Sequence, residues 1–310
     1  MAEDDCNRWI KPIYLLNNNN VTKICAPMVR YSKLGFRTLV RKYGCDLAYT
    51  PMTICDSFIK SQKARDSEFT TNKTDRPLIV QFAARNAEEL AEAAEIVVPF
   101  ADGVGLNCGC PQKWAVSSGY GACLLKKPEL LADMVRQVKS RVPDDFTMSV
   151  KIRLHSHLRT TVDMCQKAEH AGAAWVAVHG RRADQRTEPV ELEAIKQIKD
   201  SLGIPVVANG DIKSLADIRM VKEATGVNGV MVARGLLENP AMFAGYDYTP
   251  LECIRDWVDI SMSTGTPFQT FHHHLIEMLQ CNLSSAERRI FNSLTSTSAT
   301  IDYVEEHFGA

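Results

Sequence analysis

Residues 103–114 read GVGLNCGCPQKW, a short apolar run that ends in Asn107 and two cysteines and is closed by Pro111. A run of this length, bounded by glycine and proline, is typical of a buried strand that leads into a loop. Similar runs lie on both sides of it, at 22–29, 46–52, 77–83, 147–154, 175–180, 205–210 and 229–234. Together they predict eight strands at fairly even spacing.

Helical patterns lie between these runs. In the segment 128–142, Leu131, Met134 and Val135 recur at helical spacing, so that one apolar stripe faces the sheet. Strands that alternate with helices indicate a parallel sheet. Eight such units favour closure over a doubly wound open sheet, so we predict an α/β fold of the (β/α)8 TIM-barrel type.

The pattern divides the chain into three parts. Residues 1–21 are a lead-in with a polar NNNN stretch, and residues 22–245 form the barrel. After residue 245 the helical patterns follow one another with no strand between them. We therefore predict a small all-helical domain at 246–310.

Composition points to an ordinary globular protein. The 310 residues are 45% hydrophobic, and the ten cysteines are scattered rather than arranged as a disulfide framework. No apolar run approaches the length of a membrane span, and the first residues lack a signal-peptide pattern. We expect a protein of the cytoplasm or the nucleus, with free thiols, no membrane contact and a monomeric state.

Charge is distributed unevenly. The net charge is −1, but residues 241–310 hold three arginines against nine acids, which leaves the first 240 residues with an excess of five positive charges. A basic body with an acidic tail is compatible with a polyanion that docks on the body.

Polar groups stand where the predicted strands end. In barrels of this kind the reacting groups lie at the carboxyl ends of the strands, so these residues predict a site. The candidate site residues at these strand ends, polar and apolar together, are Ala26, Pro27, Met28, Gln81, Asn107, Lys151, His179, Arg181, Asn209, Gly210, Asp211, Ala233 and Arg234.

The last two strands both end in glycine, at Gly210 and Gly235, and Arg234 adds a positive charge. This is the usual place for a phosphate in a phosphate-binding barrel. The alternative is that each glycine only permits a tight connection to the next helix. If the two glycines form a phosphate site, the expected ligand is a mononucleotide or a phosphosugar.

Lys151 and His179 can each have more than one role. A lysine among valine and isoleucine on an inward strand is costly unless it meets an anion or reacts as an amine. Lys151 is therefore a Schiff-base lysine, a cation at the edge of a bound ring, or an outward side chain between helices. His179 is a ligand contact or a satisfied core histidine.

The Cys-Gly-Cys pair can be a metal site, a redox pair or one working thiol. No second pair with zinc spacing accompanies it, so we predict no metal. A redox pair usually has two intervening residues. We therefore expect Cys108 to be a buried bystander and Cys110, beside a long polar loop, to be a nucleophile or a general acid.

Eight motifs together resemble the tRNA-dihydrouridine synthases in order and spacing. They are APM (26–28), VQF (80–82), LNCGCP (106–111), GYGACLL (119–125), VKIRL (150–154), VHGR (178–181), NGDI (209–212) and VARG (232–235). More narrowly, the chain resembles the eukaryotic class that acts on uridines 20a and 20b of the tRNA D-loop. It departs from many members at Arg182, where they have threonine, and at Ala233, where they have glycine.

The resemblance implies an FMN-dependent oxidoreductase with NADPH or NADH as reductant and tRNA as substrate. Hydride passes from the flavin to C6 of uracil, and Cys110 gives a proton to C5. The implied cofactor contacts are Ala26, Pro27, Met28, Gln81, Lys151, His179, Asn209, Gly210, Asp211, Ala233 and Arg234, and the implied substrate contacts are Asn107 and Arg181. The target base must be flipped out of its stack to reach the flavin.

Contacts with RNA phosphates need basic residues. The candidates are Lys113, Lys126, Lys127, Arg181, Arg182 and Arg186, each of which can also be an ordinary surface charge. We expect the acidic tail not to bind tRNA by charge, and we expect His272, His273 and His274 to lie on a half-exposed helical turn.

Three rival functions remain open at this point. One is a flavin barrel that reduces a small pyrimidine, and another is a non-catalytic tRNA-binding flavoprotein. The third is a phosphosugar aldolase with Lys151 as nucleophile, which would be a colourless protein.

Overall fold

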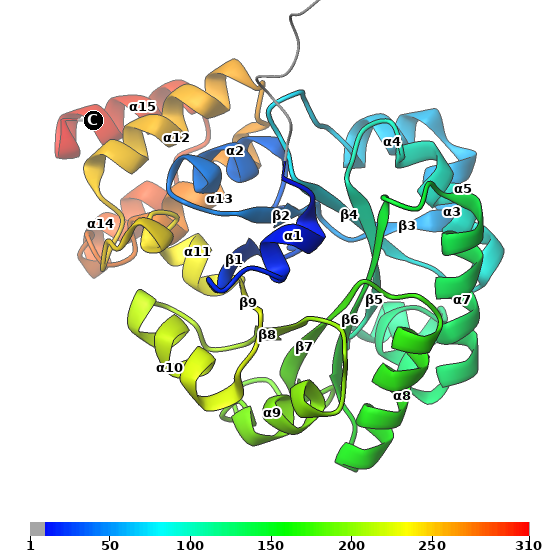
Figure 1. Ribbon diagram of the computed structural model, residues 1–310. Helices are drawn as coiled ribbons and strands as arrows, with labels where there is room; N and C mark the ends of the chain where they lie inside the picture. The colour runs from blue at the N-terminus through cyan, green and yellow to red at the C-terminus, as the bar shows by residue number, and fades with distance from the viewer. Residues whose placement is uncertain (1–9, 310) are drawn as a thin grey trace, which may run out of the picture.

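The computed structural model describes residues 10–309, and residues 1–9 of the predicted lead-in and Ala310 lie outside the described residues. Eight parallel strands close into a barrel with helices around it, which confirms the predicted fold (Figure 1). The strand order is β2-β1-β9-β8-β7-β6-β5-β4, and pairing of β2 with β4 closes the ring. The short strand β3 (Thr53–Ile54), which we did not predict, pairs with the end of β4.

The barrel strands agree with the predicted runs, although several are shorter. They are β1 (Thr22–Cys25), β2 (Leu47–Tyr49), β4 (Leu78–Ala83), β5 (Gly103–Cys108), β6 (Thr147–Leu154), β7 (Trp175–Arg182), β8 (Val206–Asn209) and β9 (Gly229–Val232). The shortened strands end where glycine, proline or a turn takes the chain away from its neighbour, and these ends carry the polar groups.

The helices of the barrel alternate with the strands. They are α2 (Leu34–Lys42), α3 (Cys55–Lys60), α4 (Gln62–Glu68), α5 (Ala87–Val97), α6 (Lys113–Ser117), the 3-10 helix η1 (Gly121–Lys126), α7 (Pro128–Arg141), α8 (Leu158–His170), α9 (Leu192–Asp200), α10 (Leu215–Thr225), α11 (Arg234–Glu238) and the 3-10 helix η2 (Met242–Ala244). The stripe predicted from residues 130–138 is the buried face of α7.

A short helix, α1 (Pro12–Leu16), lies at the amino-terminal end of the barrel. The backbone oxygen of Leu15 accepts from Thr22 at the start of β1, and that of Leu16 accepts from Asn228 just before β9. None of the helices in the described range is long and apolar enough to cross a membrane.

Four helices follow the barrel, namely α12 (Leu251–Ser263), α13 (Phe268–Met278), α14 (Ser285–Asn292) and α15 (Thr297–Phe308). They gather on one side of the barrel beside α2, in orange and red in Figure 1. Gly35 on α2 permits this approach, because a Cβ there would lie 3.0 Å from Oγ1 of Thr266. Trp257 and Phe271 are fully buried beneath the contact.

The prediction of a half-exposed histidine turn was wrong for two of the three histidines. His272 and His274 are buried, and only His273 of the three is exposed. His274 stacks on Phe36 of α2, and its Nε2 donates to the backbone oxygen of Tyr31 at 3.1 Å. Burial lowers the pKa of His274 to about 3, so it is neutral and ties the helical domain to the loop after β1.

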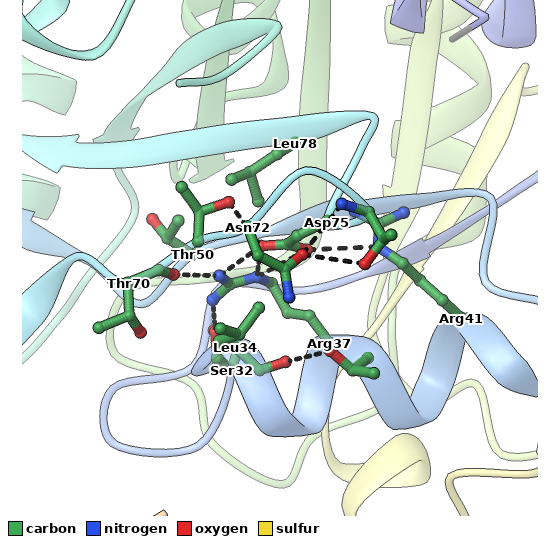
Figure 2. Close-up of polar contacts among 12 residues, drawn as sticks. Ser32, Leu34, Arg37, Arg41, Thr50, Thr70, Asn72, Asp75 and Leu78 are labelled. Atoms are coloured by element: carbon green, nitrogen blue, oxygen red, sulfur yellow. Dashed lines mark hydrogen bonds and ion pairs between the residues drawn. The ribbon is translucent and has the colours of Figure 1, made fainter. Parts of the chain in front are cut away.

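A buried ion pair between helix α2 and the loop before β4 supports the same loop (Figure 2). Arg37 on α2 is 1% exposed and pairs with Asp75, which precedes β4, at 2.6 Å. Arg37 also donates to the backbone oxygen of Ser32 at 2.6 Å, and the Oγ of Ser32 accepts from the N–H of Met28 at 2.9 Å. The pair therefore holds residues 28–32 in place behind the carboxyl end of β1.

Candidate active site

A cavity of about 200 Å³ opens at the carboxyl ends of β1, β6, β7, β8 and β9. Among the predicted cofactor residues, Met28 and Gln81 are outside its lining and the others are brought together in it. Those that line it are Ala26, Pro27, Lys151, His179, Asn209, Gly210, Asp211, Ala233 and Arg234. The parallel register of the strands brings their ends to the same level. It places His179 of β7 opposite Asn209 of β8, and Lys151 of β6 opposite Asn107 of β5.

The turn after β8 is shaped by one glycine and one strained residue. Gly210 has a φ of +122°, and a Cβ there would lie 2.7 Å from Cγ2 of Val190 and 3.1 Å from the ring of His179. Asp211 has a φ of +52°, an uncommon conformation for a residue with a side chain. An ion pair with Arg181 holds Asp211 there, and Arg234 lies 3.6 Å from its other carboxylate oxygen.

Gly235 permits the first turn of α11 to approach the loop after β8. A Cβ at this position would lie 2.4 Å from the backbone oxygen of Ile212, so a side chain cannot be accommodated without a shift. The two interpretations of these glycines are therefore compatible: the connections are tight, and the backbone is bare beside the cavity.

Positive charge dominates the cavity. Burial, and then the charges of Lys151, Arg153, Arg181 and Arg234, lower the pKa of His179 to about 2, so this histidine is neutral. Burial and then Arg153 lower the pKa of Lys151 to about 8. Asp211 is the one acid among the described residues that line the cavity. Such a site is suited to an anionic ligand.

Gln81 and Asn107 form one hydrogen-bonded unit beside the cavity. Nδ2 of Asn107 donates to Oε1 of Gln81 at 2.9 Å, and Oδ1 of Asn107 accepts from the N–H groups of Gly109 and Cys110. Nε2 of Gln81 is buried and has no partner among the described residues. An unpaired buried donor is costly, so it calls for a ligand that offers an acceptor.

Cys110 is half-buried at the mouth, and its backbone is fixed on both sides. Its N–H donates to Asn107 at 2.9 Å, and its backbone oxygen accepts from Ala122 at 2.9 Å. Gly121, at a φ of +61°, makes this return possible, since a Cβ there would lie 2.7 Å from the oxygen of Cys110. The GYGACLL segment thus folds back on Cys110 and presents it at the rim.

Cys108 is fully buried, as predicted for the bystander, and burial raises its pKa far above the usual range of a thiol. Cys110 faces the cations instead. The pKa of Lys151, lowered mainly by burial and Arg153, is partly raised again by Cys110. Within the described residues, no group of three or more His, Cys, Asp or Glu side chains is placed to hold a metal ion.

Arg181, which we predicted as a substrate contact, is buried and already bonded to other residues of the protein. It is 2% exposed, and its Nε donates to the backbone oxygen of Glu188 while its Nη2 pairs with Asp211. It fastens the loop after β7 to the loop after β8. Its role as a substrate contact stays a prediction, and the structure gives it a positioning task.

The other basic candidates fall into two groups. Arg182 pairs with Asp184 and Glu191. Lys113, Lys126, Lys127 and Arg186 are exposed and form no ion pair with another described residue.

Sequence reasoning missed Arg153, which contributes to the pKa shifts of both Lys151 and His179. The signal was available, because Arg153 follows Lys151 by two positions and side chains two apart share a face of a strand. Its guanidinium donates to the backbone oxygens of Arg182 and Gln185 at 2.9 and 3.2 Å.

The profile of the family described as dihydrouridine synthase (Dus) matches residues 24–303. The chain belongs to the dihydrouridine synthase family. This confirms the resemblance drawn from the eight motifs, and the match covers the helical domain as well as the barrel.

Relatives in other organisms extend over most of the chain. A human protein named tRNA-dihydrouridine(20a/20b) synthase [NAD(P)+]-like is 58% identical over 96% of this chain and 94% of its own length. The Schizosaccharomyces pombe tRNA-dihydrouridine(20a/20b) synthase [NAD(P)+] is 44% identical over 92% of this chain and 87% of its own. A mouse tRNA-dihydrouridine(16/17) synthase [NAD(P)(+)]-like protein is 35% identical over 82% of this chain and 54% of its own.

Among solved structures, the old yellow enzyme from Trypanosoma cruzi superposes with a TM-score of 0.53. It is 11% identical and covers 71% of this chain and 86% of its own. At this identity the likeness concerns the barrel fold alone.

Proposed function

We propose that this dihydrouridine synthase reduces the C5=C6 bond of uridine at positions 20a and 20b of the tRNA D-loop, with FMN as cofactor and NADPH or NADH as reductant. The 58% identity to a human relative with that name supports the position. The observation that carries the chemistry is the half-buried Cys110, whose backbone is fixed by Asn107 and Ala122 and whose charge acts on Lys151 of the cationic cavity.

The residues in and beside the cavity suit FMN in their chemistry. The bare backbone at Gly210, neutral His179 and Arg234 suit the ribityl phosphate, and the unpaired N–H of Gln81 suits an acceptor on the flavin ring. Lys151, together with the backbone of Ala26 and Pro27, completes the ring site. When bound, FMN supplies the hydride that adds to C6 of uracil.

The residues of this chain supply position and a proton. Asn107 accepts from the N–H of Cys110 and so fixes the backbone that carries the thiol. The Cys110 thiol holds the proton that is delivered to C5 of the flipped base, a task worth about 10²- to 10⁴-fold in rate. Lys151 is largely protonated below its pKa of about 8 and keeps the cavity positive.

The test separates the two half-reactions. Purified FMN-loaded protein and its Cys110→Ala variant are reduced with NADPH and then mixed with unmodified tRNA. We expect equal flavin reduction in both, and reoxidation with dihydrouridine formation at least 100-fold slower in the variant. Equal rates of product formation would refute the role of Cys110. A flavin-loaded parent that reduces a free pyrimidine but no tRNA would favour the small-molecule reductase.

Three further expectations stay predictions. They are the cytoplasmic or nuclear location, the monomeric state, and tRNA contacts by the basic residues of the mouth.

A further inference from the structure

Helix α6 (Lys113–Ser117) begins three residues after Cys110 and has two unlike faces. Ala115 is fully buried and packs with Tyr120 and Ala83. Trp114 is 46% exposed, and Val116 beside it is exposed as well. Trp175 and Trp257, by contrast, are fully buried. Exposed apolar side chains are common on this surface, but Trp114 is an exposed indole only four residues after Cys110, so it is a candidate contact for a ligand of the site.

The indole of Trp114 is held in one orientation. Its Nε1 donates to Oε1 of Gln112, so the one polar group of the ring is already paired. The helix beneath it is fixed because Tyr120 donates its N–H to the oxygen of Ala115 at 2.8 Å. What remains for a partner is therefore the apolar face of a rigid ring, which is suited to stacking rather than to hydrogen bonding.

The charged residues in the segments near Trp114 indicate which class of partner would bind this ring. Residues 103–128 contain no aspartate or glutamate and hold Lys113, Lys126 and Lys127. Residues 146–162, in and after β6, also lack acids. Nε2 of His155 bonds to the oxygen of Leu125 at 2.6 Å and joins the two loops. The two acids near Tyr120, Asp56 and Glu89, are paired with Arg85, so the lysines of residues 103–128 have no acid of their own segment to offset them. An exposed aromatic face in such a basic segment suits a polyanion whose units have flat rings, which is a nucleic acid.

We propose that Trp114 is a stacking platform for a nucleobase next to the reacting uridine, with Lys113 beside it as a phosphate contact. The inference rests on the proposed function, because it assumes that RNA delivers the uridine. A flipped base leaves its neighbours partly unstacked, and aromatic side chains of RNA-binding proteins commonly take up such bases.

The experiment compares Trp114→Ala and Trp114→Phe with the FMN-loaded parent. For Trp114→Ala we expect KM for tRNA to rise about tenfold, within the range for one stacked base. The kcat at saturating tRNA should stay within about twofold, and so should flavin reduction by NADPH. Trp114→Phe keeps a ring and should recover KM to within about threefold of the parent.

Tyr14→Ala is the matched control. Tyr14 is 64% exposed on α1, at the other end of the barrel, and its loss should leave KM unchanged. An unchanged KM in Trp114→Ala, or a Trp114→Phe variant as weak as Trp114→Ala, would overturn the proposal. In the first case the exposed ring would be assigned to a protein partner.

Direct binding separates this proposal from the proposed function. If the parent forms no dihydrouridine, the proposed function fails, and Trp114 can still be judged by its fluorescence when tRNA is added. Quenching of the parent that is lost in Trp114→Phe supports stacking. If the parent forms product and Trp114→Ala binds tRNA equally well, the stacking proposal alone fails.

Discussion

The rim formed by the loops after β5 and β6 and the helical domain differ in charge and in what their aromatic residues contact. The rim carries an exposed tryptophan, no acid in residues 103–128, and lysines that form no ion pair within the part of the chain that the structure describes. The segment 246–310 holds three arginines against nine acids, and its Trp257 and His274 are turned inward onto α2. The proposals above assign RNA binding to the rim, whereas the contacts of Trp257 and His274 show that the helical domain supports the loop after β1.

Among the contacts that support the loop after β1, we expect the buried ion pair between Arg37 and Asp75 to contribute most to stability. Asp75→Asn leaves the buried charge of Arg37 without its partner, and we expect a loss of about 3–5 kcal/mol in the free energy of unfolding. Urea unfolding measures it. Asp145→Asn, which removes an exposed pair with Lys11, is the control and should cost less than about 1 kcal/mol. Equal losses in both variants would show that the network does not hold the loop.

Much of the site could be predicted because parallel strands bring their carboxyl ends to one edge. Ala26, Lys151, His179 and Asn209 lie far apart in the sequence, yet their positions at strand ends are enough to place them together.

The supports could not be predicted in the same way. Arg37 and Asp75 are 38 positions apart, and neither is at a strand end, so no local pattern pairs them. The burial of His274 depends on how α13 meets α2, which is a tertiary contact. Arg181 has the residue type of a phosphate contact, and only the structure shows that Asp211 and Glu188 already occupy it.

Reversing the charges of the rim tests whether its lysines bind tRNA. Changing Lys113, Lys126 and Lys127 together to glutamate should weaken tRNA binding by about 100-fold at moderate salt. The slope of log K against log salt concentration should also become shallower by about 0.7–0.9 for each phosphate contact that is lost. Fluorescence titration over a range of salt concentrations measures both quantities.

The matched control reverses three cations of the helical domain, Arg255, Arg288 and Arg289, which are all exposed. It should change tRNA affinity by less than about threefold. If the two triple variants lose affinity equally, the division between rim and support is wrong.

A smaller effect concerns the link through His274. Its folded pKa of about 3 lies below the ordinary value of 6.5, so the unfolded chain binds this proton first as the pH falls. The contribution of neutral His274 to the free energy of unfolding is fully present above pH 6.5. Below that pH it falls by about 1.4 kcal/mol per pH unit. His179, whose pKa is about 2, adds a loss of the same sign. Urea unfolding at pH 7, 6 and 5 should show a shallower decline for His274→Gln than for the parent, and identical slopes would contradict the buried neutral state.

Dihydrouridine formation on tRNA by the purified protein decides whether Cys110 and the flavin act as proposed. FMN-loaded protein is incubated with NADPH and an unmodified tRNA that has uridine at 20a and 20b, and dihydrouridine is located by mass spectrometry of nuclease fragments. The account predicts dihydrouridine at these positions with the parent and almost none with Cys110→Ala. No dihydrouridine from the flavin-loaded parent, or equal amounts from both proteins, would contradict it.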